Sequence, residues 1–79
     1  MSLKNWEEKD NHLIRIYKLK DFQESLELVN KIGKLAEEAN HHPDLLVSYG
    51  KLEVSLTSHD QGKITAKDYN LAQKINQLI

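Results

Sequence analysis

The segment LLVSYGKLEVSLTSH, residues 45–59, decides the fold, because its second half alternates between apolar and polar side chains. A period of two places successive side chains on opposite faces of a β-strand. The apolar face contains Leu52, Val54 and Leu56, followed by Ser58. A tight turn at Gly50–Lys51 separates this strand from another strand over 45–49. The segment therefore predicts a β-hairpin with one face on a core, and it places His59 on the opposite face, where a ligand can reach it.

A helix is predicted before this hairpin. Asp21 and Glu24 have the spacing of a capping box, in which each side chain binds a backbone N–H at the helix start. Apolar side chains then recur at three- and four-residue steps, which indicates one helical stripe. The stripe contains Phe22, Leu26, Val29, Ile32 or Gly33, Ala36 and Ala39. Pro43 disfavours helical geometry at the residue before it, so the helix should end near 40–41 and place His41–His42 at that end.

The two ends of the sequence complete the pattern. Residues 11–19 are rich in β-branched, aromatic and aliphatic side chains and predict a strand, with Trp6 on a short earlier strand and a turn at 9–11. Thr65 and Asp68 repeat the capping-box spacing before a second helix. Its apolar stripe contains Tyr69, Ala72, Ile75, Leu78 and Ile79. The predicted fold is α+β, a four-stranded antiparallel sheet with two helices on one face, in the order β-β-α-β-β-α.

Length and composition exclude several classes of protein. The 79 residues allow one small domain over 1–79, and 39% hydrophobic with 29% charged residues is typical of a soluble, folded chain. A net charge of −1 gives no general attraction for nucleic acid or an anionic membrane. The absence of cysteine excludes disulfides and thiolate chemistry. No apolar run reaches the roughly 20 residues of a membrane span, and no signal-peptide core follows Met1, so we expect a cytoplasmic protein.

The small size also predicts association. A chain of this length buries only about 60% of the surface that its unfolded form exposes, so its stability margin is thin. Contacts with further copies of the chain would add buried surface. We therefore expect a homo-oligomer, a dimer or a tetramer.

Three of the four histidines are candidates for proton transfer. They are His41, His42 and His59, whereas His12 has no predicted role. Imidazole is the side chain whose unperturbed pKa lies in the physiological range, so it can give or take a proton there. Glu37 lies one helical turn before His41 and is predicted to hydrogen-bond to that imidazole. Asp68 is explained by helix capping, and Tyr49 and Trp6 are interpreted as packing residues.

The spacing of these residues resembles the signature of the pterin-4a-carbinolamine dehydratases. Glu37 is followed after three residues by His41-His42-Pro43, after five more by Tyr49, after nine by His59 and after eight by Asp68. The resemblance covers nearly the whole chain, including Trp6, Lys20-Asp21-Phe22 and residues 68–72. The chain departs from the familiar animal members in two places. Asn40 replaces an aspartate before the histidine pair, and the amino-terminal helix of longer members is not predicted.

The resemblance implies a hydro-lyase, 4a-hydroxytetrahydrobiopterin dehydratase. Such an enzyme removes water from a 4a-hydroxytetrahydropterin to give the quinonoid dihydropterin, which recycles the cofactor of aromatic amino-acid hydroxylases without a metal or organic cofactor. By the resemblance, His41 and His59 are the acids that reach the hydroxyl on either face of the pterin, and His42 binds and orients the ring, with Glu37 beside the catalytic imidazoles. The implied substrate site also contains Pro43, Ser58, Asp60 and Gln61.

Two alternatives stay open at this point. Members of the family also act as dimerisation partners of a homeodomain transcription factor, and degenerate relatives assist assembly of a carbon-fixing enzyme, so a non-catalytic protein-binding module of the same fold is the first alternative. Retention of all three histidines favours catalysis. A zinc site with Glu37 or Asp60 is the second, but no two histidines have the i, i+4 spacing that suits one metal ion, so no metal is expected. The expected partner is a small pterin, with neither direct nucleic-acid contact nor membrane contact.

Overall fold

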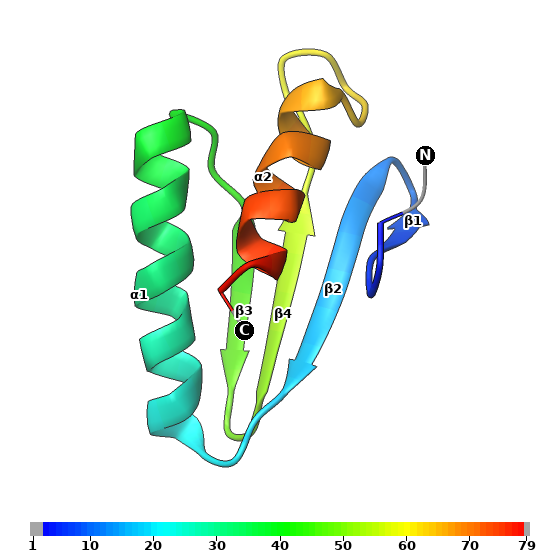
Figure 1. Ribbon diagram of the computed structural model, residues 1–79. Coiled ribbons are helices and arrows are strands. Elements are labelled where there is room, and N and C mark those ends of the chain that lie inside the picture. The colour runs from blue at the N-terminus through cyan, green and yellow to red at the C-terminus, as the bar shows by residue number, and fades with distance from the viewer. Residues whose placement is uncertain (1–2, 79) are drawn as a thin grey trace.

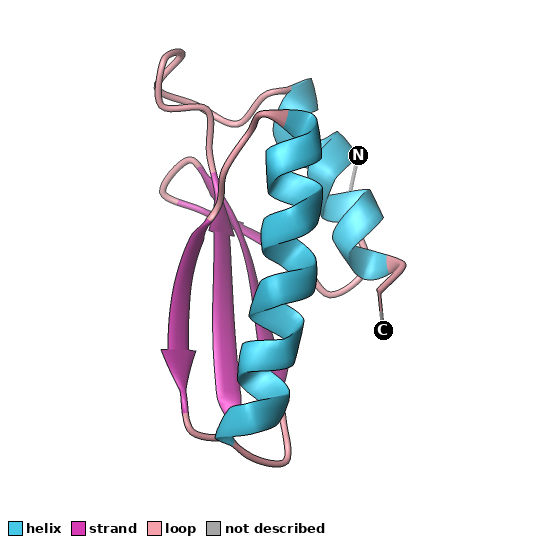
Figure 2. Cartoon of the chain, turned by 90° about the vertical axis from the view of Figure 1, so that its left-hand side faces the viewer, coloured by secondary structure: helices cyan, strands magenta, loops and turns pink. Residues whose placement is uncertain are grey.

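The centre of the fold is the strand that the alternating segment predicts, and the other strands extend the sheet on both sides of it (Figure 1). The computed structural model describes residues 3–78. Its elements are β1 (Glu7–Lys9), β2 (His12–Lys18), α1 (Phe22–Ala39), β3 (Asp44–Ser48), β4 (Lys51–Leu56) and α2 (Ala66–Asn76). The strands lie in the order β1-β2-β4-β3 with antiparallel neighbours, and both helices cover one face (Figure 2). The predicted fold class is confirmed.

The core lies between the sheet and the helices, on the apolar face of β4. Leu52, Val54 and Leu56 are completely buried there. In β2, Leu13 stands opposite Leu56 and Tyr17 opposite Leu52, so both strands turn the same face to the helices. The largest helical contributions come from Ile32, Leu71 and Ile75. Each such aliphatic side chain contributes about 1.5–3 kcal/mol when fully buried.

Local interactions set the two ends of α1. Asp21 Oδ1 accepts a hydrogen bond from the Glu24 backbone N–H at 2.9 Å, and Glu24 Oε1 accepts one from the Lys20 N–H at 2.8 Å. The helix ends at Asn40, which has a left-handed conformation with φ of 51° that asparagine tolerates better than most residues. The predicted start and end of the helix are confirmed. The chain therefore leaves α1 before Pro43, and the histidine pair lies outside the helix.

The predicted apolar stripe of α1 is partly wrong. Phe22, Leu26 and Ala39 are exposed. The buried stripe contains Ser25, Leu28, Ile32 and Ala36. The predicted and the observed stripes share Ile32 and Ala36, so the spacing of apolar residues alone does not distinguish one stripe from the other. Contacts with the sheet identify the buried stripe, because the Ser25 hydroxyl donates a hydrogen bond to the Ser48 carbonyl oxygen at 3.2 Å and this side of the helix therefore faces β3.

Helix α2 follows its predicted stripe more closely. Its N-cap is Thr65, as predicted. The residues of the predicted stripe that contact the core are Tyr69, Ala72, Ile75 and Leu78. Leu71 is also buried and was not predicted, while Ile79 lies outside the described residues. Within residues 3–78, neither helix is long and apolar enough to cross a membrane.

Trp6 and Tyr49, which were both interpreted as packing residues, differ in burial. Trp6 is buried just before β1, and its Nε1 donates a hydrogen bond to Asn76 Oδ1 at 2.8 Å, which confirms its packing role. Tyr49 is 76% exposed, so its predicted packing role is wrong.

The hairpin turn consists of Tyr49 and Gly50, one residue earlier than predicted, and Lys51 already belongs to β4. The φ of 70° at Gly50 favours glycine at this turn.

Tyr17 gives a first testable prediction. Its side chain is 5% exposed, and its hydroxyl has no hydrogen-bond partner in the part of the chain that the structure describes. A buried hydroxyl without a partner costs about 1–3 kcal/mol. We therefore expect Tyr17→Phe to raise the free energy of unfolding at neutral pH by about 1 kcal/mol, measured by urea denaturation. A variant less stable than wild type would show that the hydroxyl is satisfied.

The same substitution should change the stability at alkaline pH. Burial raises the pKa of Tyr17, and the nearby Arg15 opposes this shift. Because the pKa is higher in the folded than in the unfolded state, the contribution of the neutral phenol is complete below pH of about 10 and is lost as the pH rises through the folded-state pKa. Unfolding of wild type should therefore become easier above this pH, and Tyr17→Phe should show a shallower decline. Equal slopes for the two proteins would contradict this assignment.

Candidate active site

The predicted site residues lie at one end of the sheet, where α1 ends, β3 begins, β4 ends and α2 begins (Figure 1). His41 and His42 belong to the connection between α1 and β3. His59 belongs to the loop between β4 and α2, and Asp68 to the first turn of α2. The topology therefore brings together residues from both halves of the sequence.

Asp68 is the buried anchor of this site. Its Oδ2 accepts hydrogen bonds from the Thr65 backbone N–H at 2.8 Å and from the Ser58 hydroxyl at 2.9 Å, while its Oδ1 lies 2.5 Å from His41 Nε2. The predicted cap at Thr65 is confirmed. The interpretation of Asp68 as a capping residue alone is incomplete, because the same carboxylate fixes an imidazole that is 27 residues away in sequence.

His41 is consequently held in one orientation. Its side chain is only 14% exposed, and Asp68 binds its Nε2. In the described chain, Nδ1 of this imidazole has no protein partner. A carboxylate that binds one ring nitrogen of an imidazole determines which nitrogen is left for proton transfer.

Glu37 lies beside His42, and the predicted contact with His41 is wrong. Its Oε2 is 2.5 Å from His42 Nε2. The prediction placed Glu37 and His41 one helical turn apart, but α1 ends at Ala39 and the left-handed Asn40 turns the chain away before His41. His41, which follows Asn40, therefore points to Asp68, and His42 lies beside Glu37 in the last turn of α1. Its side chain is 55% exposed, so a substrate can reach it.

His59 is the most exposed of the three imidazoles. Its side chain is 72% exposed, and its Nε2 lies 4.0 Å from Asp44 Oδ2. This agrees with the predicted accessible position. Asp44 starts β3, and nothing in the sequence except its place after Pro43 marks it as a site residue. The contact is too long for a hydrogen bond, so His59 is placed less firmly than the other two.

Carboxylates lie beside all three histidines at this end of the sheet. Asp68 binds both His41 and Ser58, the residue before His59. Asp44 follows His42 by two residues and lies 4.0 Å from His59. Each imidazole therefore has a carboxylate of its own, and the three differ in exposure. Imidazoles beside carboxylates are groups that can donate and accept protons.

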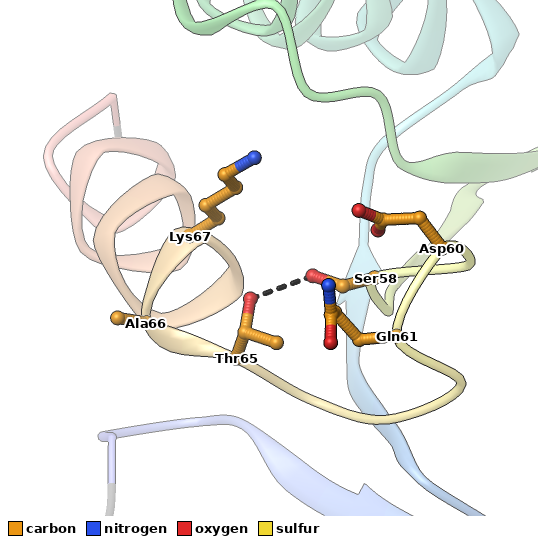
Figure 3. A pocket seen from close by; sticks show the side chains of 6 residues that line it. All are labelled: Ser58, Asp60, Gln61, Thr65, Ala66 and Lys67. Carbon is orange, nitrogen blue, oxygen red and sulfur yellow. Dashed lines mark hydrogen bonds between the residues drawn. The ribbon is translucent and has the colours of Figure 1, made fainter.

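A cavity of about 240 Å³, whose lining Figure 3 shows, lies next to Asp68, because Ser58 in its lining binds that carboxylate. It is lined by Ser58, Asp60, Gln61, Thr65, Ala66 and Lys67. Ser58, Asp60 and Gln61 belong to the predicted substrate site. Pro43 and the imidazoles are not part of this lining. The sequence interpretation missed Thr65 and Lys67 as site residues, and only their closeness to Asp68 in the chain could have indicated them.

The arrangement does not resemble a metal centre. Among residues 3–78, no group of three or more histidine, aspartate and glutamate side chains is placed to hold a metal ion. Each imidazole faces a different carboxylate, from Glu37, Asp44 or Asp68.

Comparisons with known proteins give a consistent result. The sequence model of the family described as pterin 4 alpha carbinolamine dehydratase matches residues 1–78. A protein from Picosynechococcus named "Putative pterin-4-alpha-carbinolamine dehydratase" is 47% identical over 73 residues, which are 92% of this chain and 79% of the relative. A protein of the same name from Sulfolobus acidocaldarius is 42% identical over 76 residues, 96% of this chain and 84% of the relative.

Two solved structures share the fold. A Brucella melitensis protein described as a transcriptional coactivator/pterin dehydratase has a TM-score of 0.88 and 28% identity, and the match covers 95% of this chain and 82% of that protein. A pterin dehydratase-like protein described as a RuBisCO assembly factor of the alpha-carboxysome has a TM-score of 0.73 and 14% identity, over 92% of this chain and 84% of that protein. At the second level of identity, the likeness concerns the fold alone.

Proposed function

The chain belongs to the pterin 4 alpha carbinolamine dehydratase family, and from that premise we propose that it removes water from 4a-hydroxytetrahydropterins by histidine acid–base catalysis. The observation that carries this proposal is the group of three imidazoles at one end of the sheet, each beside a carboxylate. The product is the quinonoid dihydropterin, so the enzyme serves tetrahydropterin recycling in the cytoplasm.

The chemistry requires proton transfer at two places. Hydroxide is a poor leaving group, so an acid must protonate the 4a-oxygen as the C4a–O bond breaks and the adjacent ring nitrogen forms a C=N bond. A proton must then leave the pterin, so the enzyme gains one proton for each one it gives. Imidazoles suit both steps near neutral pH, and such catalysis typically accelerates a reaction by about 10²- to 10⁴-fold.

The three imidazoles take different roles in this proposal. His41, fixed by Asp68, and His59, near Asp44, are the acids on the two faces of the pterin. His42 binds and orients the ring, with Glu37 holding its Nε2. The mechanism uses no metal or organic cofactor.

A second candidate function is a protein-binding or assembly module. The descriptions of the two solved relatives mention coactivation and RuBisCO assembly. This chain also exposes large apolar side chains, namely Ile16, Phe22, Leu26, Leu46 and Tyr49. Such residues also suit the proposed homo-oligomer. A scaffold has no need of three imidazoles with carboxylate partners, so catalysis is the better supported function.

The test is the dehydration itself. The 4a-hydroxytetrahydropterin is generated in a stopped-flow instrument, and the loss of its absorbance is followed with and without the protein. We expect the absorbance to fall at least about 10²-fold faster with the protein than in buffer that contains free imidazole. The imidazole concentration in this control equals the total concentration of histidine side chains in the protein sample. A rate equal to that of the imidazole control would reject catalysis and favour the protein-binding function.

A further inference from the structure

We propose that Ser58 is a positioning residue for His41, and that it acts through the Asp68 carboxylate rather than through contact with the substrate. Thr65 lies behind Ser58 and Asp68 lies in front of it, so three side chains form one row that ends at the imidazole. This role rests on the proposed function, because it assumes that His41 transfers a proton to the pterin oxygen. It adds the residues that hold this imidazole in place.

The Ser58 hydroxyl is removed from solvent and bound on two sides. Ser58 is 1% exposed, and its Oγ lies 2.9 Å from Asp68 Oδ2 and 2.6 Å from Thr65 Oγ1. Figure 3 shows the bond between Ser58 and Thr65 as a dashed line. A hydroxyl has a single hydrogen, and Ser58 donates its hydrogen to Asp68. Although Ser58 lines the cavity, this hydrogen is therefore not left for a ligand.

The hydrogens in this row all point toward Asp68. An ionised carboxylate only accepts hydrogen bonds, so the Ser58 hydroxyl is the donor to Asp68 and Thr65 is the donor to Ser58. Hydrogen bonds in such a chain polarise and strengthen one another. The Thr65 hydroxyl therefore strengthens the contact between Ser58 and Asp68.

Asp68 needs these contacts because the last torsion of an aspartate side chain is soft. The χ2 angle of aspartate has a broad distribution, so rotamer preference alone does not fix the plane of the carboxylate. Oδ2 accepts from the Ser58 hydroxyl at 2.9 Å and from the Thr65 backbone N–H at 2.8 Å. Two donors at one oxygen fix this plane, and Oδ1 then faces His41 Nε2. Without the Ser58 hydroxyl, one of the two donors is lost and the carboxylate can turn.

The backbone of Ser58 has a separate role, because it closes the loop that carries His59. Its N–H donates to the Lys63 carbonyl oxygen at 3.1 Å, and its carbonyl oxygen accepts from the N–H groups of Gln61 at 3.0 Å and Gly62 at 2.9 Å. These bonds do not involve the side chain. Ser58→Ala therefore removes the hydroxyl and leaves the loop of His59 closed.

The first test observes His41 directly and needs no turnover. Long-range proton–nitrogen NMR spectra of isotope-labelled protein show which ring nitrogen carries the proton, at a pH of about 8.5, where an ordinary imidazole is neutral. Because the carboxylate only accepts, we expect wild-type His41 to be held as the Nε2–H tautomer. In Ser58→Ala its nitrogen signals should shift toward a mixture of both tautomers, and Ser58→Thr, which keeps a hydroxyl, should restore them. Unchanged His41 signals in Ser58→Ala would overturn the positioning role.

Ser25→Ala is the matched control. Ser25 is also completely buried, and its hydroxyl donates to the Ser48 carbonyl oxygen at 3.2 Å near the start of α1, whereas His41 follows the end of this helix. Each alanine variant removes one buried hydroxyl, but we expect the His41 signals to change in Ser58→Ala alone. A shift of equal size in both variants would assign the effect to a general loosening of the fold and reject the proposal.

Turnover supplies the second test. We expect Ser58→Ala to lower kcat about five- to tenfold, the effect of one buried hydrogen bond, and to leave KM within about twofold. In the His41→Ala background the same substitution should have no further effect, because residues that act as one unit are not additive. Equal losses in both backgrounds would mean that Ser58 acts on the substrate directly, which contradicts the proposal.

The two tests separate this role from the proposed function. If wild type does not dehydrate the pterin but the His41 signals respond to Ser58→Ala, the positioning stands and the catalytic function fails. If wild type is active and these signals do not respond, the function stands and the positioning fails. Should Ser58→Ala not fold, Thr65→Val takes its place, because it removes the donor behind Ser58. We expect a shift of the His41 signals in the same direction, and wild-type signals in this variant would reject the row of hydrogen bonds.

Discussion

Replacing His42 by alanine is expected to lower the rate of dehydration by about 10²- to 10⁴-fold. This imidazole is half exposed at the end of α1, and Glu37 holds its Nε2 at 2.5 Å, so it is both accessible to a pterin and fixed in orientation. Removing it takes away the group that orients the ring for both proton transfers. His41→Ala and His59→Ala should each slow the reaction less, and unequally for the two 4a-stereoisomers, because each acid serves one face of the ring.

The fourth histidine supplies the control for this series. His12 begins β2, and its Nδ1 lies 2.8 Å from the Asp10 carbonyl oxygen; within residues 3–78 it forms no ion pair with the carboxylates beside the other three imidazoles. His12→Ala removes the same side chain and should leave stopped-flow rates unchanged. Rates within threefold of wild type in His42→Ala, at an unchanged free energy of unfolding, would contradict the proposed catalytic role of this residue.

The sequence predicts the elements of this fold because local chemistry determines each of them. The alternation in β4 sets which side chains face the core, and Leu52, Val54 and Leu56 are indeed completely buried. Asp21 and Thr65 start the two helices as their capping-box spacing predicts. These signals act within a few residues, so one sequence is enough to read them.

The errors concern choices that depend on distant contacts. The α1 stripe was misplaced at its ends because the Ser25–Ser48 hydrogen bond, between residues 23 apart, rotates the helix on the sheet. The predicted partner of Glu37 was wrong because the left-handed conformation of a single residue, Asn40, determines which histidine contacts the last turn of α1. Asp68 was read as a cap alone because nothing near it in the sequence points to His41.

The proposed catalytic site and the stability of the fold depend on a common residue. Asp68 caps α2, binds a buried hydroxyl and fixes an imidazole, all with one carboxylate that is completely buried. Asp21, the N-cap of α1, also accepts a backbone hydrogen bond at the start of a helix, from the Glu24 N–H, but within residues 3–78 its side chain binds no imidazole. Both aspartates thus accept a backbone N–H at the start of a helix, one from the N-cap position and one from the third helical position, and of the two it is Asp68 that also makes the long-range contact.

Asp68→Ala is expected to lower the free energy of unfolding by about 3 kcal/mol or more. The substitution leaves the Thr65 N–H, the Ser58 hydroxyl and the His41 Nε2 without their acceptor, and a buried donor without a partner costs about 1–3 kcal/mol. This is a large part of the roughly 5–15 kcal/mol that stabilises a typical domain, so the variant is followed by urea denaturation at low temperature.

Asp68→Asn keeps the prediction testable if the alanine variant does not fold. The side-chain oxygen of asparagine can still accept from the Thr65 backbone N–H, so stability should fall by only about 1–2 kcal/mol, but the charge that holds His41 is lost and dehydration should slow by at least about tenfold. Asp21→Asn, the same substitution at the N-cap of α1, should change neither quantity appreciably, because asparagine and aspartate are equally good N-caps. If both asparagine variants behave alike in urea and in the stopped-flow assay, Asp68 is a cap and nothing more, and His41 does not depend on it for orientation.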